Sequence, residues 1–216
     1  MKVSLVIPVY NAEKSLPVLL ESIRAQTFRD FEVVFADDAS TDGSATLLEN
    51  FVRESGLPCR VLHARENGGA AAARNLALEA AQGEYLAFAD ADDRMDPALL
   101  ETAAAAAGGA DIVGWDWTLG LSPNGRYMRQ ASYGTAEQAL LNLTGGTMRW
   151  NLWLFLVRRD LAADIRFIPG ADMGEDMQFM LRCFLRAKTV VQLHRSLYHY
   201  NDTSETSISR AFSTLR

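Results

Sequence analysis

The stretch Glu84-Tyr-Leu-Ala-Phe-Ala-Asp-Ala-Asp-Asp93 is an apolar run that passes directly into three carboxylates. The apolar residues Tyr85 to Ala89 predict a buried strand. Acidic side chains at its carboxyl end would repel one another unless a cation lay between them. Carboxylate oxygens suit Mg²⁺ or Mn²⁺, which commonly share their coordination with substrate phosphates. A solvated acidic turn that caps a helix starting at Asp96-Pro97 explains the same residues equally well.

The segments before this stretch alternate between strands and helices. Short apolar runs predict strands at residues 3–9, 31–36 and 59–63, and helical spacing follows each of them at 16–25, 45–52 and 70–81. Such alternation predicts an α/β fold whose parallel sheet has right-handed crossovers and binds ligands at the carboxyl ends of its strands.

The alternation lapses after a predicted helix at 96–107 and a predicted strand at 112–118. Later elements are predicted as a helix at 136–143, an apolar aromatic stretch at 150–157, a helix at 175–187 and a strand at 189–193. The second half is therefore expected to be less regular than the first.

Composition excludes several classes of protein. The chain has 216 residues, 49% of them hydrophobic, and a formal charge of −6 without any run of basic residues, which argues against nucleic-acid binding. Its two cysteines form no paired motif, so neither a zinc knuckle nor a disulfide framework is expected. The amino terminus lacks a signal-peptide pattern and no stretch is apolar enough to span a bilayer, which predicts a cytoplasmic protein.

Polar residues gather in the loops that follow the first four predicted strands. Asp37 and Asp38 offer acceptors for a base or a ribose, and Tyr10 offers a flat face. Asn67 and Arg74 can bind a base or a phosphate. Each residue alone has an ordinary structural explanation, but together on one crevice they indicate a nucleotide pocket. Neither a G-x-G-x-x-G turn nor a Walker lysine is present, so a glycine-rich loop does not hold the phosphate.

Five motifs follow one another along the chain: Ser4-Leu-Val-Ile-Pro-Val-Tyr-Asn11, Asp37-Asp-Ala-Ser-Thr-Asp-Gly-Ser44, Gly68 through Asn75, Phe88-Ala-Asp-Ala-Asp-Asp93 and Glu175-Asp176. In order and spacing they resemble the motifs of the family 2 glycosyltransferases with the GT-A fold. The resemblance implies an α/β, Rossmann-like GT-A fold with a mostly parallel sheet flanked by helices. It predicts a single domain over 1–210, with a nucleotide-sugar-binding half at 1–115 and an acceptor half at 116–210. Residues 211–216 are expected to be a tail, and a shortened piece of a longer protein is one interpretation of the chain's length.

The resemblance also implies roles for single residues. The implied donor-binding residues are Pro8, Val9, Tyr10, Asn11, Asp38, Asn67, Arg74, Asp90 and Ala91. Asp92 is the implied direct metal ligand, Asp90 belongs to the metal shell, and His199 is an additional candidate ligand, although a packed strand histidine is the simpler interpretation. Asp176 matches the catalytic base and Glu175 its companion, while both acids would also suit a helix N-terminus. The family's tryptophan-lysine pair is incomplete here, because the stretch after Trp153 has no lysine.

The activity implied by the resemblance is an inverting, hexosyltransferase-type transfer from a UDP-sugar to a hydroxyl acceptor, with Mn²⁺ or Mg²⁺. The acceptor would be a carbohydrate or a glycolipid of a surface polysaccharide pathway, with the enzyme in the cytoplasm or in peripheral contact with the inner face of the membrane. A nucleotidyltransferase that makes nucleotide-sugars and a non-catalytic nucleotide-sugar binding module are the alternatives.

Overall fold

The computed structural model describes residues 2–122, 124–170 and 174–202. Within these ranges one nine-stranded sheet has the order β3-β2-β1-β4-β8-β6-β9-β5, with β7 paired to β6. The strands are β1 (Val3–Val9), β2 (Phe31–Asp37), β3 (Cys59–His63), β4 (Tyr85–Phe88), β5 (Arg94–Met95), β6 (Ile112–Leu119), β7 (Arg126–Met128), β8 (Phe155–Arg158) and β9 (Val190–Tyr200). The helices are α1 (Leu16–Arg24), α2 (Ser44–Glu54), α3 (Gly69–Ala80), α4 (Leu99–Ala107), α5 (Ala136–Thr144) and α6 (Glu175–Arg186).

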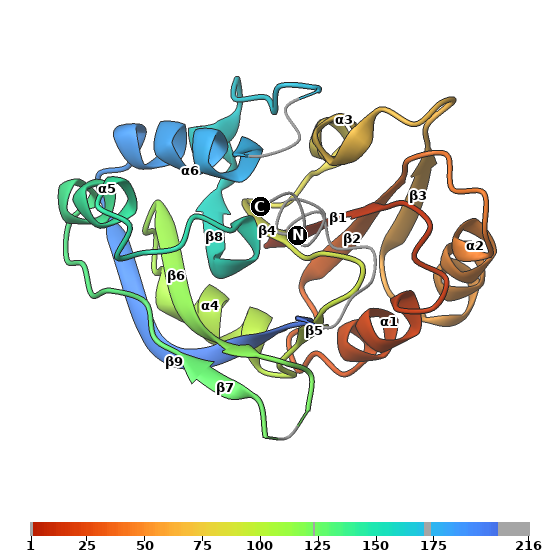
Figure 1. Cartoon of the computed structure of the whole chain (residues 1–216), viewed down its shortest axis with the longest axis horizontal. Coiled ribbons are helices and arrows are strands. Elements are labelled where there is room, and N and C mark those ends of the chain that lie inside the picture. The colour runs from red at the N-terminus through yellow and green to blue at the C-terminus, as the bar shows by residue number, and fades with distance from the viewer. Residues whose placement is uncertain (1, 123, 171–173, 203–216) are drawn as a thin grey trace, which may run out of the picture.

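The first half of the chain builds a parallel sheet, as its alternating pattern predicts. β1 pairs in parallel with β2 on one side and with β4 on the other, and β2 pairs in parallel with β3. β2 is buried along its whole length, which is typical of a parallel strand covered on both faces. Because these strands run the same way, the loops that follow them meet at one edge of the sheet (Figure 1).

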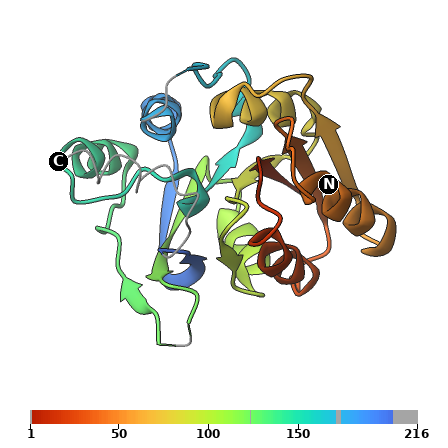
Figure 2. The ribbon, with the colours of Figure 1, turned by 45° about the vertical axis from the view of Figure 1, so that its right-hand side comes forward.

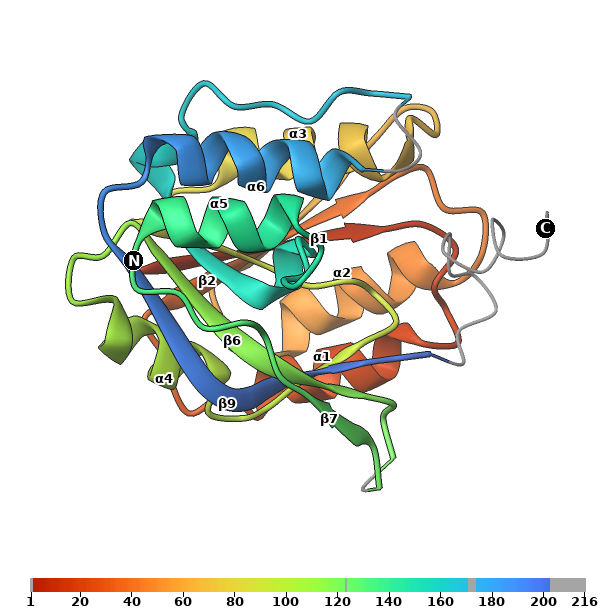
Figure 3. The ribbon, with the colours of Figure 1, turned by 60° about the vertical axis from the view of Figure 1, so that its left-hand side comes forward.

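Helices cover both faces of this sheet. Figure 3 shows α3, α5 and α6 on one side of it and α1, α2 and α4 on the other. The buried face of α1 carries Leu16, Leu19, Leu20 and Ile23, the residues whose spacing predicts the helix.

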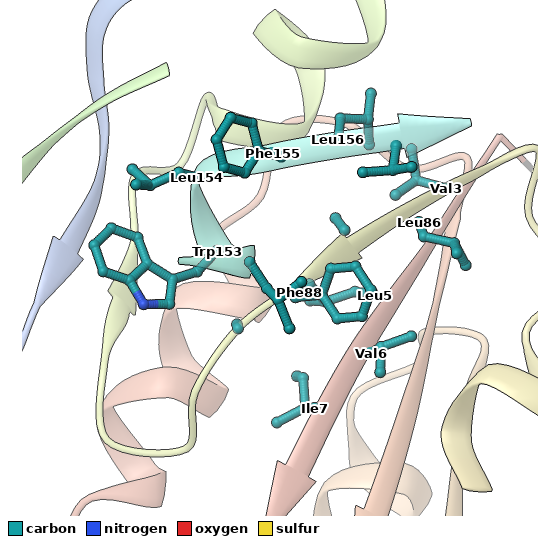
Figure 4. Close-up of a cluster of buried hydrophobic side chains, with 14 of the residues drawn as sticks. Val3, Leu5, Val6, Ile7, Leu86, Phe88, Trp153, Leu154, Phe155 and Leu156 are labelled. Atoms are coloured by element: carbon teal, nitrogen blue, oxygen red, sulfur yellow. The ribbon is translucent and has the colours of Figure 1, made fainter. Parts of the chain in front are cut away.

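An antiparallel strand joins the two halves of the sheet. β8 lies between β4 and β6, so that Leu156 is paired with Ala87 on one side and with Val113 on the other. Figure 4 shows apolar side chains of β1 and β4 in the same cluster as those of β8, among them Leu5, Phe88 and Phe155. One hydrophobic core therefore runs from the first half of the chain into the second.

The start of α4 differs from the sequence prediction. The helix begins at Leu99 rather than at Asp96, and Met95 belongs to β5, which pairs with β9. The Oδ1 atom of Asp96 accepts a hydrogen bond from the backbone N–H of Ala98, so Asp96 closes a turn before the helix. The Asp-Pro signal was correct about a helix and wrong about its first residue, because pairing with a distant strand extends the backbone there.

The second half contains strands that the sequence did not predict. β9 is longer than the strand predicted at 189–193, since it pairs in parallel with β6 from Val190 to Tyr200. The apolar stretch at 150–157 forms a short 3₁₀ turn, Leu152–Leu154, and then β8. Figure 2 shows the short green strand β7 at one edge of the molecule. The predicted tail at 211–216 lies outside the described residues, and no helix within them is long and apolar enough to cross a bilayer.

Candidate active site

A pocket of about 670 Å³ lies where the carboxyl-end loops of β1, β2 and β4 meet the amino end of α6. This volume is in the range of small-molecule sites. The structure brings nearly all of the sequence-predicted site residues to its lining: Pro8, Val9, Tyr10, Asn11, Asp38, Asn67, Arg74, Asp90, Ala91, Asp92, Glu175 and Asp176. Residues far apart in the sequence therefore share one site, while their individual roles stay predictions.

The loop after β1 is fastened to the loop after β2. Asn11 adopts a left-handed backbone conformation with φ of 47°, and its Oδ1 atom accepts a hydrogen bond from the Thr41 N–H at 2.8 Å. The N–H of Asn11 donates to the Ser40 Oγ atom at 3.1 Å. Tyr10 remains 48% exposed beside the pocket, so its ring is accessible to a ligand. These contacts give Asn11 a structural role that its motif did not reveal.

Asp38 holds the turn that precedes α3. Its buried carboxylate accepts hydrogen bonds from the backbone N–H groups of Gly68 at 2.9 Å and Gly69 at 2.8 Å, and from Asn67 Nδ2 at 3.0 Å. Gly69 has φ of +80°, a conformation that favours glycine. Asp38 therefore shapes the wall on which the resemblance places the nucleoside. The neighbouring Asp37 is absent from the pocket lining, since its carboxylate contacts His63 and the N–H of Ser40.

Arg74 crosses the pocket floor and joins its two sides. Its Nη2 atom lies 3.1 Å from Asp90 Oδ1, and its Nη1 atom lies 3.1 Å from Glu175 Oε1 and 3.2 Å from Asp176 Oδ1. Burial opposes the charge of Arg74, but the three carboxylates outweigh it and raise the pKa of the guanidinium. The sequence suggests a base or phosphate contact for Arg74; the structure adds a bridge between the strand-end acids and α6.

The acidic run after β4 is ordered by the last strand. Asp93 is buried, and its Oδ2 atom accepts a hydrogen bond from the Tyr198 hydroxyl at 2.9 Å, while Oδ1 accepts one from the Asn201 N–H at 2.7 Å. The Tyr198 hydroxyl in turn accepts the Asp90 N–H at 3.0 Å. Burial, together with repulsion from Asp90 and Asp92, raises the pKa of Asp93. Asp93 thus positions the loop, while Asp90 and Asp92 line the pocket.

The donor chemistry of this loop fits a hard divalent cation. Two carboxylates that line a small-molecule pocket are the usual protein share of a Mg²⁺ or Mn²⁺ site, with substrate oxygens and waters completing it. Among the described residues no group of three or more histidine, cysteine or acidic side chains could hold a metal by itself. The residues therefore fit a cation that binds together with a phosphorylated substrate rather than a preformed all-protein site.

His199 lies apart from this donor set. It is absent from the pocket lining. On β9 it pairs with Arg94 of β5, and its Nδ1 atom lies 3.2 Å from Arg94 Nη2. Burial and the positive charge of Arg94 lower the pKa of its imidazole. This placement favours a packed strand histidine, so we leave His199 out of the metal site proposed below.

Asp176 is a buried carboxylate, and one of its oxygens is held by an ion pair with Arg74 but by no hydrogen bond from the described part of the chain. Its Oδ2 atom accepts a hydrogen bond from the Leu152 N–H at 3.3 Å, whereas the buried Oδ1 atom accepts no hydrogen bond from a described residue, despite the nearby Arg74 charge. Burial, opposed by the charge of Arg74, raises the pKa of Asp176 to about 6. A base with a free lone pair and a pKa near neutrality is suited to accept a proton.

The further lining residues include Trp150, Asn151 and Tyr200, to which no motif gave a role. Trp150 is half-buried and is one of two tryptophans in the aromatic stretch at 150–157. The other, Trp153, is buried in the core, where its ring stacks on Tyr198 with centroids 4.7 Å apart. Burial therefore separates a tryptophan available to a ligand from one that serves packing.

Comparisons with known proteins show which sequences this chain is similar to. The family model described as glycosyl transferase family 2 matches residues 4–170. The uncharacterized glycosyltransferase EpsJ of Bacillus subtilis (strain 168) is 29% identical over 211 residues, covering 93% of this chain and 61% of EpsJ. Poly(ribitol-phosphate) beta-N-acetylglucosaminyltransferase TarS of Staphylococcus aureus (strain Mu50 / ATCC 700699) is 30% identical over 208 residues, covering 93% of this chain and 35% of TarS.

A solved structure is similar along most of the chain. The crystal structure of S. aureus TarS 1-349 in complex with UDP-GlcNAc superimposes with a TM-score of 0.82 and 26% identity, covering 97% of this chain and 61% of that chain. The α/β fold expected from the resemblance is thereby confirmed. This chain spans about three fifths of the length of EpsJ and of that TarS chain.

Proposed function

This chain belongs to glycosyl transferase family 2, and from that premise we propose that it transfers a sugar from a nucleotide-diphosphate donor to a hydroxyl acceptor. The observation that carries the proposal is the placement of Asp90 and Asp92 in the same pocket as Asp176. Such a transfer requires carboxylates that hold a cation for the leaving diphosphate. It also requires a base for the incoming alcohol.

The donor is proposed to be a UDP-sugar that occupies the side of the pocket built from the β1 and β2 loops. TarS, whose crystal structure is described in complex with UDP-GlcNAc, supports this donor class. Tyr10 would lie against the base, and the polar groups of Asp38 and Asn67 would border the ribose. Because Asp38 already holds Asn67 and the two glycine N–H groups, it acts on the donor partly by fixing the shape of this wall.

Asp92, with Asp90 beside it, is proposed to hold a divalent cation. Such a cation, when bound, neutralises negative charge on the diphosphate. Arg74 adds a fixed positive charge next to Asp90 and keeps that carboxylate oriented through the 3.1 Å contact. Asp93 and Tyr198 hold the backbone of the loop, so both pocket-lining carboxylates are presented from a fixed position.

Asp176 is proposed to be the catalytic base. Its Oδ1 atom takes the proton of the acceptor hydroxyl while the hydroxyl oxygen forms a bond to C1 of the sugar, and the bond from C1 to the diphosphate oxygen breaks with its electron pair leaving on UDP. Attack from the face opposite UDP inverts the configuration at C1. General-base catalysis of this kind typically contributes about 10²–10⁴-fold. Glu175 supports the base by sharing Arg74 with it.

A role in surface polysaccharide or glycolipid synthesis is the cellular setting that we propose. TarS is described as acting on poly(ribitol-phosphate), which supports a carbohydrate-type acceptor. Peripheral contact with a membrane and a cytoplasmic location stay predictions from the sequence.

The proposal is tested by thermal-shift measurements with nucleoside diphosphates, each with and without Mn²⁺, followed by donor-hydrolysis assays. A ligand that binds the folded state raises its melting temperature, so UDP with Mn²⁺ is expected to stabilise the protein and Asp92→Ala to abolish the metal-dependent part. Pyrophosphate release from a nucleoside triphosphate and a sugar phosphate would instead identify a nucleotidyltransferase. UDP binding without transfer to any acceptor of a broad panel would identify a binding module.

A further inference from the structure

Charge is distributed unevenly between the two halves of the chain. In residues 1–115 acidic side chains outnumber basic ones, whereas in residues 116–216 basic side chains outnumber acidic ones, although the whole chain is acidic. The excess positive charge therefore belongs to the half that follows the donor-binding loops.

Three exposed arginines of this half, Arg126, Arg129 and Arg149, belong to segments that meet beside the pocket; we call them the arginine ridge. None of them forms an ion pair with a carboxylate in the part of the chain that the structure describes. Only Arg129 makes a side-chain contact there, from its Nε atom to His194 Nδ1 at 3.4 Å. Among the described residues, therefore, no carboxylate lies within ion-pairing distance of the ridge.

A buried acid anchors one side of the ridge. The fully buried Asp116 on β6 accepts hydrogen bonds from the Gln130 N–H at 2.8 Å and from the Tyr127 hydroxyl, and its Oδ2 atom lies 3.2 Å from His194 Nδ1. The Nε2 atom of the same histidine lies 2.8 Å from Ser132 Oγ. The segment that carries Arg126 and Arg129 is therefore fixed on β6 and β9 rather than being a free surface loop.

Gln130 brings Arg149 to the same place. Its Nε2 atom donates to the Arg149 carbonyl at 3.3 Å, and its Oε1 atom accepts the Arg149 N–H at 3.0 Å. Two hydrogen bonds from the Gln130 side chain hold the backbone of Arg149 close to Gln130, which directly follows Arg129 in the chain. The next residue along the chain, Trp150, lines the pocket.

Strand pairing places the other end of the ridge close to the pocket as well. Arg126 of β7 pairs with Leu119 of β6, which pairs with Tyr200 of β9, and Tyr200 lines the pocket. Two steps between neighbouring strands amount to roughly 10 Å. None of the three arginines is itself part of the pocket lining. By strand pairing Arg126 shares the sheet face of Leu119 and Tyr200, whereas the Arg129 side chain reaches His194 on the face that carries Asp116.

We infer that the arginine ridge binds an anionic carbohydrate acceptor, a chain whose phosphate or carboxylate groups lie on Arg126 and Arg149 while one hydroxyl enters the pocket past Trp150. This inference rests on the proposed function and names the acceptor class for the same site. A guanidinium presents planar paired donors that match phosphate and carboxylate oxygens, so unneutralised arginines at a site entrance favour such a ligand.

The test measures binding of three fluorescently labelled chains by anisotropy, in the presence of UDP: a phosphodiester-linked polyol, polygalacturonate and uncharged dextran. An anionic chain is expected to bind more tightly than dextran, and its affinity is expected to fall as salt rises. The two anionic probes distinguish phosphate from carboxylate recognition.

The variant that tests the ridge is the double substitution Arg126→Gln with Arg149→Gln. Arg129 is left in place because it contacts His194. The double variant is expected to bind the anionic chain about tenfold more weakly and to lose part of the salt dependence, because two charge-assisted contacts disappear. Replacing the same two arginines by lysine keeps the charge and is expected to restore part of the affinity.

The matched control is Arg29→Gln with Arg53→Gln, which makes the same change in net charge on exposed residues away from the pocket lining. The thermal shift with UDP is measured for every variant. If the parent protein shows no thermal shift with UDP, the proposed function itself is refuted. If it shows the shift but binds dextran and anionic chains equally well, only the role of the arginine ridge is refuted. If the control pair loses as much affinity for the anionic chain as the ridge variant does, the inference is wrong. It is also wrong if phosphatidylglycerol vesicles displace the chain and the chain has no effect on turnover.

Discussion

Buried carboxylates stand on both sides of the pocket, and they differ in how their oxygens are used. On the strand side, both oxygens of Asp38 and both oxygens of Asp93 accept hydrogen bonds from the protein. On the helix side, Asp176 has one buried oxygen that accepts none from the described residues. The first two acids thus fix the backbone of loops, while the third keeps an unused acceptor in the site.

This difference separates a structural acid from a reactive one. Buried polar atoms are nearly always hydrogen-bonded, so an exception in a pocket indicates a group that a ligand completes. Composition and burial alone do not distinguish the three residues. Their hydrogen-bond partners do, and each of the predictions below changes one side of the comparison.

The largest effect is expected for Asp176→Asn. An amide of the same size cannot accept the acceptor's proton, so kcat is expected to fall by about 10²–10⁴ while the thermal shift with UDP and Mn²⁺ persists. The measurement is UDP release under saturating donor. Full turnover of this variant would remove Asp176 from the mechanism.

Glu175→Gln provides the matched comparison next to the base. Glu175 accepts a hydrogen bond from Arg74 Nη1 at 3.1 Å but has no unsatisfied buried oxygen among the described atoms. Its loss is expected to lower kcat less than Asp176→Asn does. An equal loss in the two variants would mean that the acidic pair acts as one unit.

Asp38→Ala tests the opposite side and is expected to act on stability. The substitution leaves the N–H groups of Gly68 and Gly69 and the Asn67 amide without their acceptor, which costs roughly 3 kcal/mol if the loop does not rearrange. Denaturant unfolding measures the effect. Glu66→Ala, an exposed acid in the same loop, is the control and is expected to stay within about 0.5 kcal/mol of the parent.

The pH dependence of turnover sharpens the assignment of Asp176. With a pKa of about 6, the base is half protonated near pH 6 and its active fraction falls about tenfold for each unit below that. Activity is therefore expected to rise between pH 5 and pH 7, the direction required of a group that works deprotonated. Donor binding, followed by thermal shift over the same range, separates the base from other titrating groups. A rate that stays constant down to pH 4 would contradict the raised pKa.

The smallest effect is expected for Tyr198→Phe. The change removes the hydroxyl that donates to Asp93 and accepts the Asp90 N–H, which should cost about 1–2 kcal/mol of stability and weaken the Mn²⁺-dependent part of the UDP shift. Tyr85→Phe is the control, because it removes one buried hydroxyl that donates to the Ala110 carbonyl, away from the acidic loop. It should lower stability without changing the metal dependence. If both variants respond alike to Mn²⁺, Tyr198 does not position the loop.

Much of the fold could be predicted because its signals are local. The spacing of Leu16, Leu19, Leu20 and Ile23 predicts α1, and the apolar run from Tyr85 predicts β4, within one residue or so of the observed bounds. The carboxyl ends of parallel strands share an edge, so the clustering of the β1, β2 and β4 loops also followed from order along the chain. The lapse in alternation after β6 marked the region where strands β7 and β8 and the extension of β9 were missed.

By itself the sequence determined the alternating elements of the first half and the identity of the residues that reach the pocket, because side-chain periodicity and motif order are properties of neighbouring positions. Only the tertiary structure decided what those residues do to one another. The contact of Arg74 with Glu175 spans 101 positions and that of Asp93 with Tyr198 spans 105, and no local pattern encodes such pairs. They exist because β8 inserts between β4 and β6 and β9 pairs along β6, which brings the acidic loop, the last strand and α6 to one edge of the sheet.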